Sequence, residues 1–270
     1  MSLAQQTKKY FKNNKFPLRK RGQNFLINKN AIQKIINASN LYSSDQVVEI
    51  GAGTGNLTKF LLKAKKIIAI EIDGFLINIL KKRFENNSKV VIKNKDIREF
   101  SLTSLNLKDY KVISNIPFNI TGLLIKKLLT ENNKPKNIII VLQKQVGKRI
   151  VANPPNMSLL SVSVKFFGKP EIIGNISKNS FWPRPKVDSV ILKIKPNKKY
   201  SITKDKFFKV VKAGFRHPRK YLLNNLFLSG IINKEKAREF FKELNLNLKI
   251  RAEKLNVKDW VDLANLIFKK

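Results

Sequence analysis

The chain has 270 residues, of which 55 are Lys or Arg and 18 are Asp or Glu, giving a formal net charge of +37. This excess of cations predicts a polyanionic partner, which the motifs below favour as RNA over DNA or a membrane, and the absence of cysteine excludes disulfides and cysteine-rich zinc sites. With a single histidine, His217, and no apolar stretch of the roughly 18 residues that a membrane span needs, we expect a cytoplasmic monomer without a metal.

The first 196 residues predict a basic arm followed by an α/β domain. Residues 1–20 are polar and basic, and we expect them to be mobile until they meet a partner. Residues 21–196 alternate apolar strands with helical patterns, which predicts a mostly parallel, doubly wound sheet. The predicted strands are 46–50, 66–71, 90–92, 111–114, 137–142, 162–167 and 187–194. The predicted helices are 31–38, 56–64, 74–84, 121–129 and 143–151.

The remaining residues, 197–270, predict a small helical domain after a polar linker that contains proline. The helical patterns cover residues 206–214, 219–227, 234–244 and 257–268. Cations and apolar residues alternate between positions 206 and 220, so that one face can be buried while the other offers cations to phosphates. The candidate RNA-binding residues are Lys212, Arg216, Arg219 and Lys220, with Arg19, Lys20 and Arg21 of the arm. The alternative is a solvated basic face.

A glycine loop, Gly51-Ala52-Gly53-Thr54-Gly55, joins the first predicted strand of the sheet to a predicted helix. Glycine lets the backbone turn sharply and lets a ligand approach without meeting a Cβ. The dinucleotide fingerprint G-x-G-x-x-G requires glycine where this chain has Asn56, which argues against NAD.

Two acids follow the next two predicted strands. Glu71, at the end of the second strand, can accept hydrogen bonds from both ribose hydroxyls of a cofactor, and Asp96, after the third, can accept from an adenine amine. These acceptors suit S-adenosylmethionine, because its adenosine carries no phosphate for them to repel. The alternative is a glycine turn with solvated acids.

The tetrapeptide Asn115-Ile116-Pro117-Phe118 follows the fourth predicted strand and suits a flat base that bears an amine. The Asn115 side chain and the Ile116 carbonyl can accept the two amine hydrogens, which makes the nitrogen of adenine N6 more nucleophilic. Pro117 stiffens the turn and has no competing N–H, while Phe118 can stack on an extruded base. Methyl transfer by direct displacement then needs no covalent intermediate.

These motifs, in this order, resemble the ribosomal RNA adenine dimethyltransferase family. The similar runs, spread over residues 19–265, are Arg21 to Leu26, Glu49 to Thr58, Glu71 to Asp73, Asn115 to Thr121, Gln143-Lys144, Phe181 to Val190 and Arg251 to Leu255. The chain departs from the family pattern at Phe118, where Tyr is usual, and at Gln145, where Glu is usual.

The resemblance implies a class I, Rossmann-like methyltransferase domain at residues 21–196 and an RNA-binding helical domain at 197–270. It implies that S-adenosylmethionine is contacted by Asn24, Leu26, Gly51, Gly53, Glu71, Asp96 and Asn115. The same resemblance implies that the adenine is handled by Asn115, Ile116, Pro117 and Phe118, with Phe181 as a second aromatic residue.

The function expected from this resemblance is N6,N6-dimethylation of two adjacent adenines near the 3′ end of small-subunit rRNA, in the rRNA or in a pre-small-subunit ribosomal particle. Two alternatives stay open. One is a resistance-type methylase of large-subunit rRNA, and the other is a non-catalytic organellar transcription or assembly factor.

Overall fold

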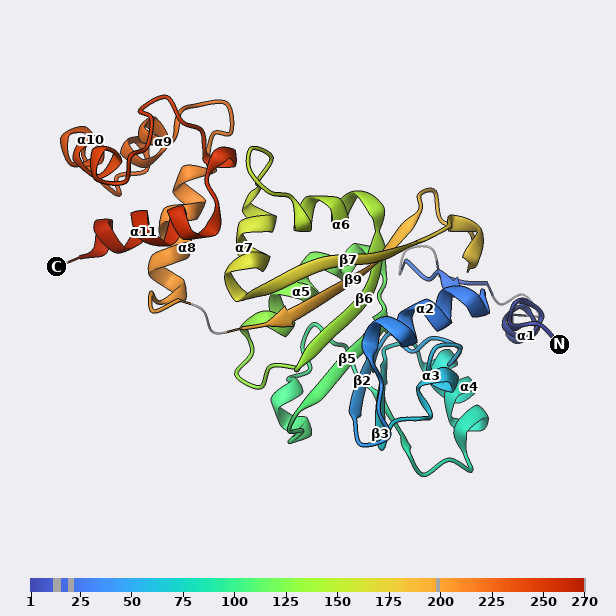
Figure 1. The fold of residues 1–270 in the computed structure, drawn as a ribbon. Coiled ribbons are helices and arrows are strands. Elements are labelled where there is room, and N and C mark those ends of the chain that lie inside the picture. Colours follow the sequence, from blue (N-terminus) through green and yellow to red (C-terminus); the bar gives the residue numbers. More distant parts are fainter. Residues whose placement is uncertain (12–15, 19–21, 198–199, 270) are drawn as a thin grey trace. The chain divides into compact units, whose positions relative to one another are not determined.

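The computed structural model describes the chain in four stretches, residues 1–11, 16–18, 22–197 and 200–269 (Figure 1). The chain divides into two compact units, of which the first contains residues 1–147 and 169–196 and the second contains residues 148–168 and 197–270. The helical unit thus begins earlier than the expected domain 197–270, because residues 148–168 share its core.

Seven strands form the main sheet of the first unit, in the order β4-β3-β2-β5-β6-β9-β7. Their bounds are Gln46–Ile50 (β2), Lys66–Glu71 (β3), Val90–Asn94 (β4), Tyr110–Asn115 (β5), Asn137–Gln143 (β6), Gly168–Ile176 (β7) and Ser189–Pro196 (β9). Neighbours from β4 to β6 pair in parallel, and β9 pairs antiparallel with β6. The direction of winding reverses between β2 and β5, where doubly wound sheets bind ligands.

Helices cover both faces of this sheet. Those of the first unit are Leu3–Tyr10 (α1), Lys29–Ser39 (α2), Thr58–Leu61 (α3), Gly74–Phe84 (α4) and Thr121–Thr130 (α5), and Lys144–Val151 (α6) follows β6. Helix α2 packs through Ile32 and Ile35 on strand residues such as Val47 and Ile139. Helix α5 lies on the opposite face (Figure 1).

The predicted helix 56–64 is much shorter in the structure. Only α3, a helix of 4 residues, forms there, and no side chain caps its start. The preceding loop holds the backbone of Gly51, Gly53 and Gly55 at positive φ, so that helical geometry begins late.

The prediction of a strand at 162–167 is wrong. These residues belong to helix α7 (Leu159–Phe167), which begins at a capping box between Ser158 and Ser161. The apolar residues of the run Val-Ser-Val-Lys-Phe-Phe fit the two-residue period of a strand as well as the spacing of a helix. The capping box at Ser158 stabilises the helix. The edge strand β7 follows directly and was not predicted, because Pro170 and Gly174 occupy inward positions and interrupt its apolar pattern.

The prediction of a mobile N-terminal arm is wrong for residues 3–10, which form helix α1. Ser2 and Gln5 form a capping box at its start, and Leu3 and Thr7 are buried. Residues 12–15 and 19–21 of the expected arm lie outside the described residues.

The second unit is helical, as predicted. It contains α7, Lys204–Gly214 (α8), Leu222–Leu228 (α9), Lys234–Glu243 (α10) and Val257–Phe268 (α11). Its core is built on Trp260, Phe207 and Phe241, all fully buried, and the ring of Phe166 stacks on Phe207 at 3.9 Å between centroids. Within the described part of the chain, no helix is long and apolar enough to cross a membrane.

Candidate active site

The glycine loop leaves the carboxyl end of β2 and has no room for a side chain at two of its glycines. Gly53 has φ +59°, and a Cβ there would lie 3.1 Å from the Phe25 ring. Gly55 has φ +78°, and a Cβ there would lie 2.6 Å from the Phe84 ring. Both positions therefore require glycine for conformation and for space. Gly51 to Thr54 of the loop line a pocket.

Glu71 is the last residue of β3, and its carboxylate is held by the backbone around the loop. Oε2 accepts a hydrogen bond from the N–H of Gly53 (2.9 Å), and Oε1 accepts from the N–H groups of Ile72 (2.9 Å) and Asp73 (3.0 Å). Burial raises the pKa of Glu71, and these three donors oppose that rise. The side chain is therefore fixed beside the loop, as a ribose acceptor must be.

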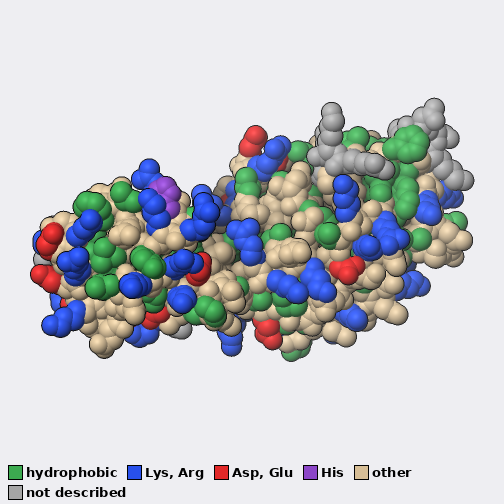
Figure 2. Space-filling model, turned by 90° about the horizontal axis from the view of Figure 1, so that it is seen from above, with side chains coloured by type: hydrophobic (Ala, Val, Ile, Leu, Met, Phe, Trp, Pro, Cys, Tyr) green, Lys and Arg blue, Asp and Glu red, His purple; other side chains and the backbone are tan. Residues whose placement is uncertain are grey.

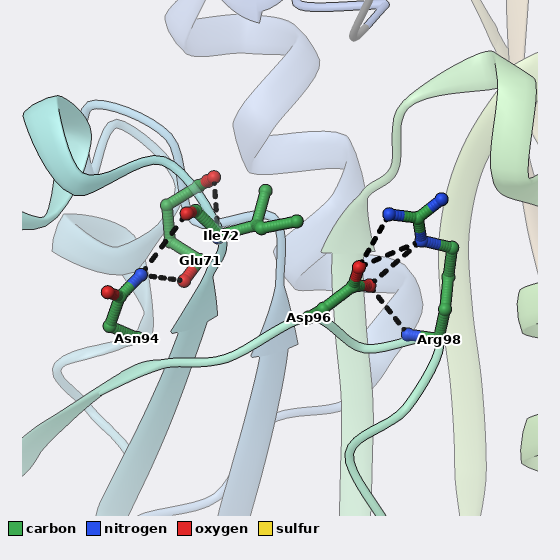
Figure 3. Close-up of polar contacts among 5 residues, drawn as sticks. All are labelled: Glu71, Ile72, Asn94, Asp96 and Arg98. Atoms are coloured by element: carbon green, nitrogen blue, oxygen red, sulfur yellow. Dashed lines mark hydrogen bonds and ion pairs between the residues drawn. The ribbon is translucent and has the colours of Figure 1, made fainter.

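Asp96 follows β4, and in the structure it is paired with Arg98 (Figure 3). Its carboxylate accepts from the Arg98 backbone N–H (2.9 Å) and from Nε and Nη2 of the guanidinium (2.6 Å to Nη2). These hydrogen bonds lower the pKa of Asp96, and those from the Arg98 side chain contribute most. Asn94 Nδ2 donates to the Glu71 and Ile72 carbonyls and so joins the ends of β3 and β4 (Figure 3). Any further donor to Asp96 must share its carboxylate with Arg98.

The tetrapeptide lies at the end of β5, directly against the glycine loop. A Cβ on Gly51 would lie 3.4 Å from Cδ of Pro117, and Ser114 Oγ donates to the Ile50 carbonyl. Asn115 Nδ2 donates to the carbonyl oxygen of Asn24 (2.9 Å), which fixes the amide and leaves its Oδ1 to accept from a ligand.

One pocket joins the glycine loop, the 22–26 segment, Glu71 and the tetrapeptide. Its lining residues are Gly22, Gln23, Asn24, Phe25, Leu26, Glu49, Gly51, Ala52, Gly53, Thr54, Asn56, Leu57, Glu71, Ile72, Leu76, Asn115, Ile116, Pro117 and Phe118. A second pocket adjoins it, with Asp96, Ile97 and Arg98 in its wall, and the two pockets share Gly51, Glu71, Ile72 and Pro117. The structure thus brings together six of the seven residues expected to contact the cofactor, and Asp96 lies in the adjoining pocket.

The pocket fits S-adenosylmethionine on two observations. The Thr54 hydroxyl is buried there without a hydrogen-bond partner among the described residues. None of the described lining residues is Lys or Arg, although the chain carries 55 of them. A pocket lined by acids and amides, with no cation among its described lining residues, suits a cationic ligand and does not suit a phosphate.

Comparison with known proteins places the chain in one family. The family described as "Ribosomal RNA adenine dimethylase" matches residues 13–269. The chain belongs to this family. It is 38% identical over 257 residues to ribosomal RNA small subunit methyltransferase A of Clostridioides difficile, covering 91% of this chain and 89% of the relative. It is 39% identical over 249 residues to the protein of that name from Mycoplasmopsis pulmonis, covering 90% and 95%.

Solved structures of the family's fold agree with the architecture described above. A dimethyladenosine transferase from Plasmodium falciparum matches with a TM-score of 0.77 and 30% identity, covering 87% of this chain and 94% of that one. The 23S rRNA methyltransferase ErmE matches with a TM-score of 0.74 over 90% and 99%, and at 18% identity this likeness concerns the fold alone. The predicted class I methyltransferase fold with a helical C-terminal region is confirmed.

Within this dimethylase fold, Phe181 does not line the pocket with the other expected residues. It lies in a two-residue strand, β8 (Phe181–Trp182), which pairs antiparallel with β1 (Phe25–Leu26). Its side chain is only 3% exposed and packs in the hydrophobic core. Trp182 packs with Phe11 and Phe25 instead.

The expected RNA-binding residues of the helical unit are all exposed. Lys212 lies in the last turn of α8, and Arg216, Arg219 and Lys220 follow it before α9. Figure 2 shows far more Lys and Arg than acidic side chains, with the purple histidine beside blue cations. Arg19, Lys20 and Arg21 lie outside the described residues. No group of three potential metal ligands occurs in the described part of the chain.

Sequence reasoning missed a buried polar network beneath the loop. Glu49 is 1% exposed and accepts from the Thr58 hydroxyl (2.6 Å), and burial raises its pKa to about 8. Arg83 of α4 donates to the Thr54 carbonyl (2.6 Å) and to Asn56 Oδ1 (3.1 Å). The signal was a single acid inside the apolar run Val-Val-Glu-Ile, since a charged residue is rarely buried without a partner.

Proposed function

We propose that this chain is an S-adenosylmethionine-dependent rRNA adenine dimethyltransferase. Its substrate would be N6 of two adjacent adenines near the 3′ end of small-subunit rRNA, in a pre-small-subunit particle in the cytoplasm, and the enzyme would act as a monomer without a metal. Family membership and the names of the bacterial relatives support the substrate class.

The observation that carries the cofactor assignment is that no described residue lining the pocket formed by the glycine loop, Glu71 and the tetrapeptide is Lys or Arg, in a protein of net charge +37. Lys95 and Arg98 line the adjoining pocket. A site for a nucleoside phosphate would be expected to use this supply of cations. Here Glu71 and the amide of Asn24 face the ligand instead, and the loop is G-x-G-x-G. We therefore assign the ribose to Glu71 and the adenine to the pocket wall that holds Asp96.

The tetrapeptide provides the site for the target base. Bound S-adenosylmethionine supplies a methyl group activated by its sulfonium sulfur. Asn115 Oδ1 and the Ile116 carbonyl accept the two hydrogens of the adenine amine and so concentrate its lone pair on nitrogen. Phe118, in the same pocket wall, covers the face of the extruded base. Rate enhancement then comes from holding the two reactants in line.

Labelled methyl transfer to small-subunit rRNA from cells that lack the modification tests this proposal. The wild-type chain should transfer label, and Asn115→Ala should abolish transfer while RNA affinity stays close to that of the wild type. Asn78→Ala, at an exposed position of α4 that lines neither pocket, serves as the control. Turnover by Asn115→Ala would show that the amide does not act on the target amine.

A further inference from the structure

Asn56 ends the glycine loop, and its side chain joins three separate segments of the first unit. Nδ2 donates to Oγ1 of Thr7 on α1 (2.8 Å) and to the carbonyl oxygen of Leu26 on β1 (3.0 Å). Oδ1 accepts from Arg83 on α4 (3.1 Å). The side chain is 4% exposed, and both amide hydrogens and the oxygen are used. Asn56 is therefore a fixed junction rather than a solvated turn residue.

Thr7 is the polar contact that α1 makes to this junction. It is fully buried, so water has no access to replace its hydroxyl as the acceptor for Asn56. The Thr7 hydroxyl therefore ties the position of α1 to the position of the loop, because neither group can move without breaking a buried hydrogen bond.

A second, apolar contact leads from the same helix to the same loop. Phe11, at the carboxyl end of α1, packs against Phe25 with 5.2 Å between ring centroids. The Phe25 ring in turn lies over Gly53, where an added Cβ would be only 3.1 Å away. The N–H of Gly53 donates to Glu71. Both contacts of α1 thus reach the residues that line the cofactor pocket.

We propose that helix α1 is a positioning element of the cofactor site and that Asn56 couples its docking to cofactor binding. The inference rests on the proposed function, since it adds determinants to the same cofactor pocket. Thr7 and Asn56 act through the loop and not on the reacting atoms. Coupling is reciprocal, so a ligand that requires this loop geometry must stabilise the docked helix. A loosened helix must in turn lower the affinity for that ligand.

Thr7→Val tests the coupling, because it removes the hydroxyl with little change of shape and leaves one Asn56 hydrogen without an acceptor. We expect the Kd of S-adenosylhomocysteine, measured by calorimetry, to rise about tenfold, the equivalent of about 1.4 kcal/mol. RNA affinity should not change, and Thr7→Ser, which keeps the hydroxyl, should bind as the wild type does. Thr130→Val on α5 is the matched control, since within the described residues that hydroxyl donates to the Lys126 carbonyl of its own helix (2.8 Å).

Hydrogen exchange on the wild-type chain gives a readout that needs no variant to fold. Amides of residues 3–10 should exchange more slowly when S-adenosylhomocysteine is added. Unchanged exchange in α1 while the ligand binds, or wild-type affinity of a folded Thr7→Val, would overturn the coupling. A wild-type chain that binds no S-adenosylhomocysteine would overturn the proposed function together with it.

Discussion

Replacing Glu71 by Gln should separate cofactor binding from RNA binding. A carboxylate offers roughly four acceptor positions. Three are taken in the structure, two on Oε1 by the N–H groups of Ile72 and Asp73 and one on Oε2 by Gly53. With donors counted among the described residues, one position therefore remains for a ligand hydroxyl. Glutamine keeps the shape but has a single oxygen, so its amide nitrogen must face either the N–H groups of Ile72 and Asp73 or the Gly53 N–H together with the ligand.

The size of the effect follows from that one remaining position. A hydrogen bond to a charged group contributes about 1.5–3 kcal/mol, so its loss should raise the Kd of S-adenosylhomocysteine about 10- to 150-fold. Calorimetry measures this change, and RNA affinity should stay at the wild-type value. Glu85→Gln, an exposed residue at the end of α4, is the control. If Glu71→Gln bound the ligand as tightly as the wild type, the ribose would not be held by Glu71.

Three further changes test the electrostatics. Arg98→Ala should tighten S-adenosylhomocysteine binding a few-fold by freeing Asp96, and looser binding would mean that Arg98 contacts the cofactor. Burial raises the pKa of Glu49 from 4.5 to about 8, so the folded chain keeps a proton that the unfolded chain releases. The free energy of unfolding should fall between those pH values, by at most about 1.4 kcal/mol per pH unit, and urea titrations should show a flatter dependence in Glu49→Gln. Replacing Arg216 and Arg219 by Gln should reduce the slope of log affinity against log salt by about 0.7–0.9 per cation that contacts phosphate, and an unchanged slope would remove both from the RNA surface.

The sheet and the cofactor loop could be predicted because their signals are local. Buried parallel strands are continuous apolar runs, and the loops after β2 and β5 must meet where the winding reverses. Gly53 and Gly55 were recognisable because no other residue fits their backbone conformation and space.

Features that depend on tertiary contacts could not be predicted. The N-terminal segment is basic and polar, and only the burial of Leu3 and Thr7 shows that α1 packs on the sheet domain. The pairing of Asp96 with Arg98 depends on a turn whose geometry no periodicity reveals. Phe181 was assigned through its motif, yet pairing with β1 turns its side chain into the core.

Nucleoside analysis of ribosomal subunits tests the central claim most directly. Small and large subunits from cells that lack the modification would be incubated with the wild-type chain and S-adenosylmethionine, and their RNA digested and analysed by mass spectrometry. The account predicts N6,N6-dimethyladenosine in small-subunit RNA, at two residues per particle, and none with Asn115→Ala. Dimethyladenosine confined to large-subunit RNA, or absent from both subunits, would contradict it.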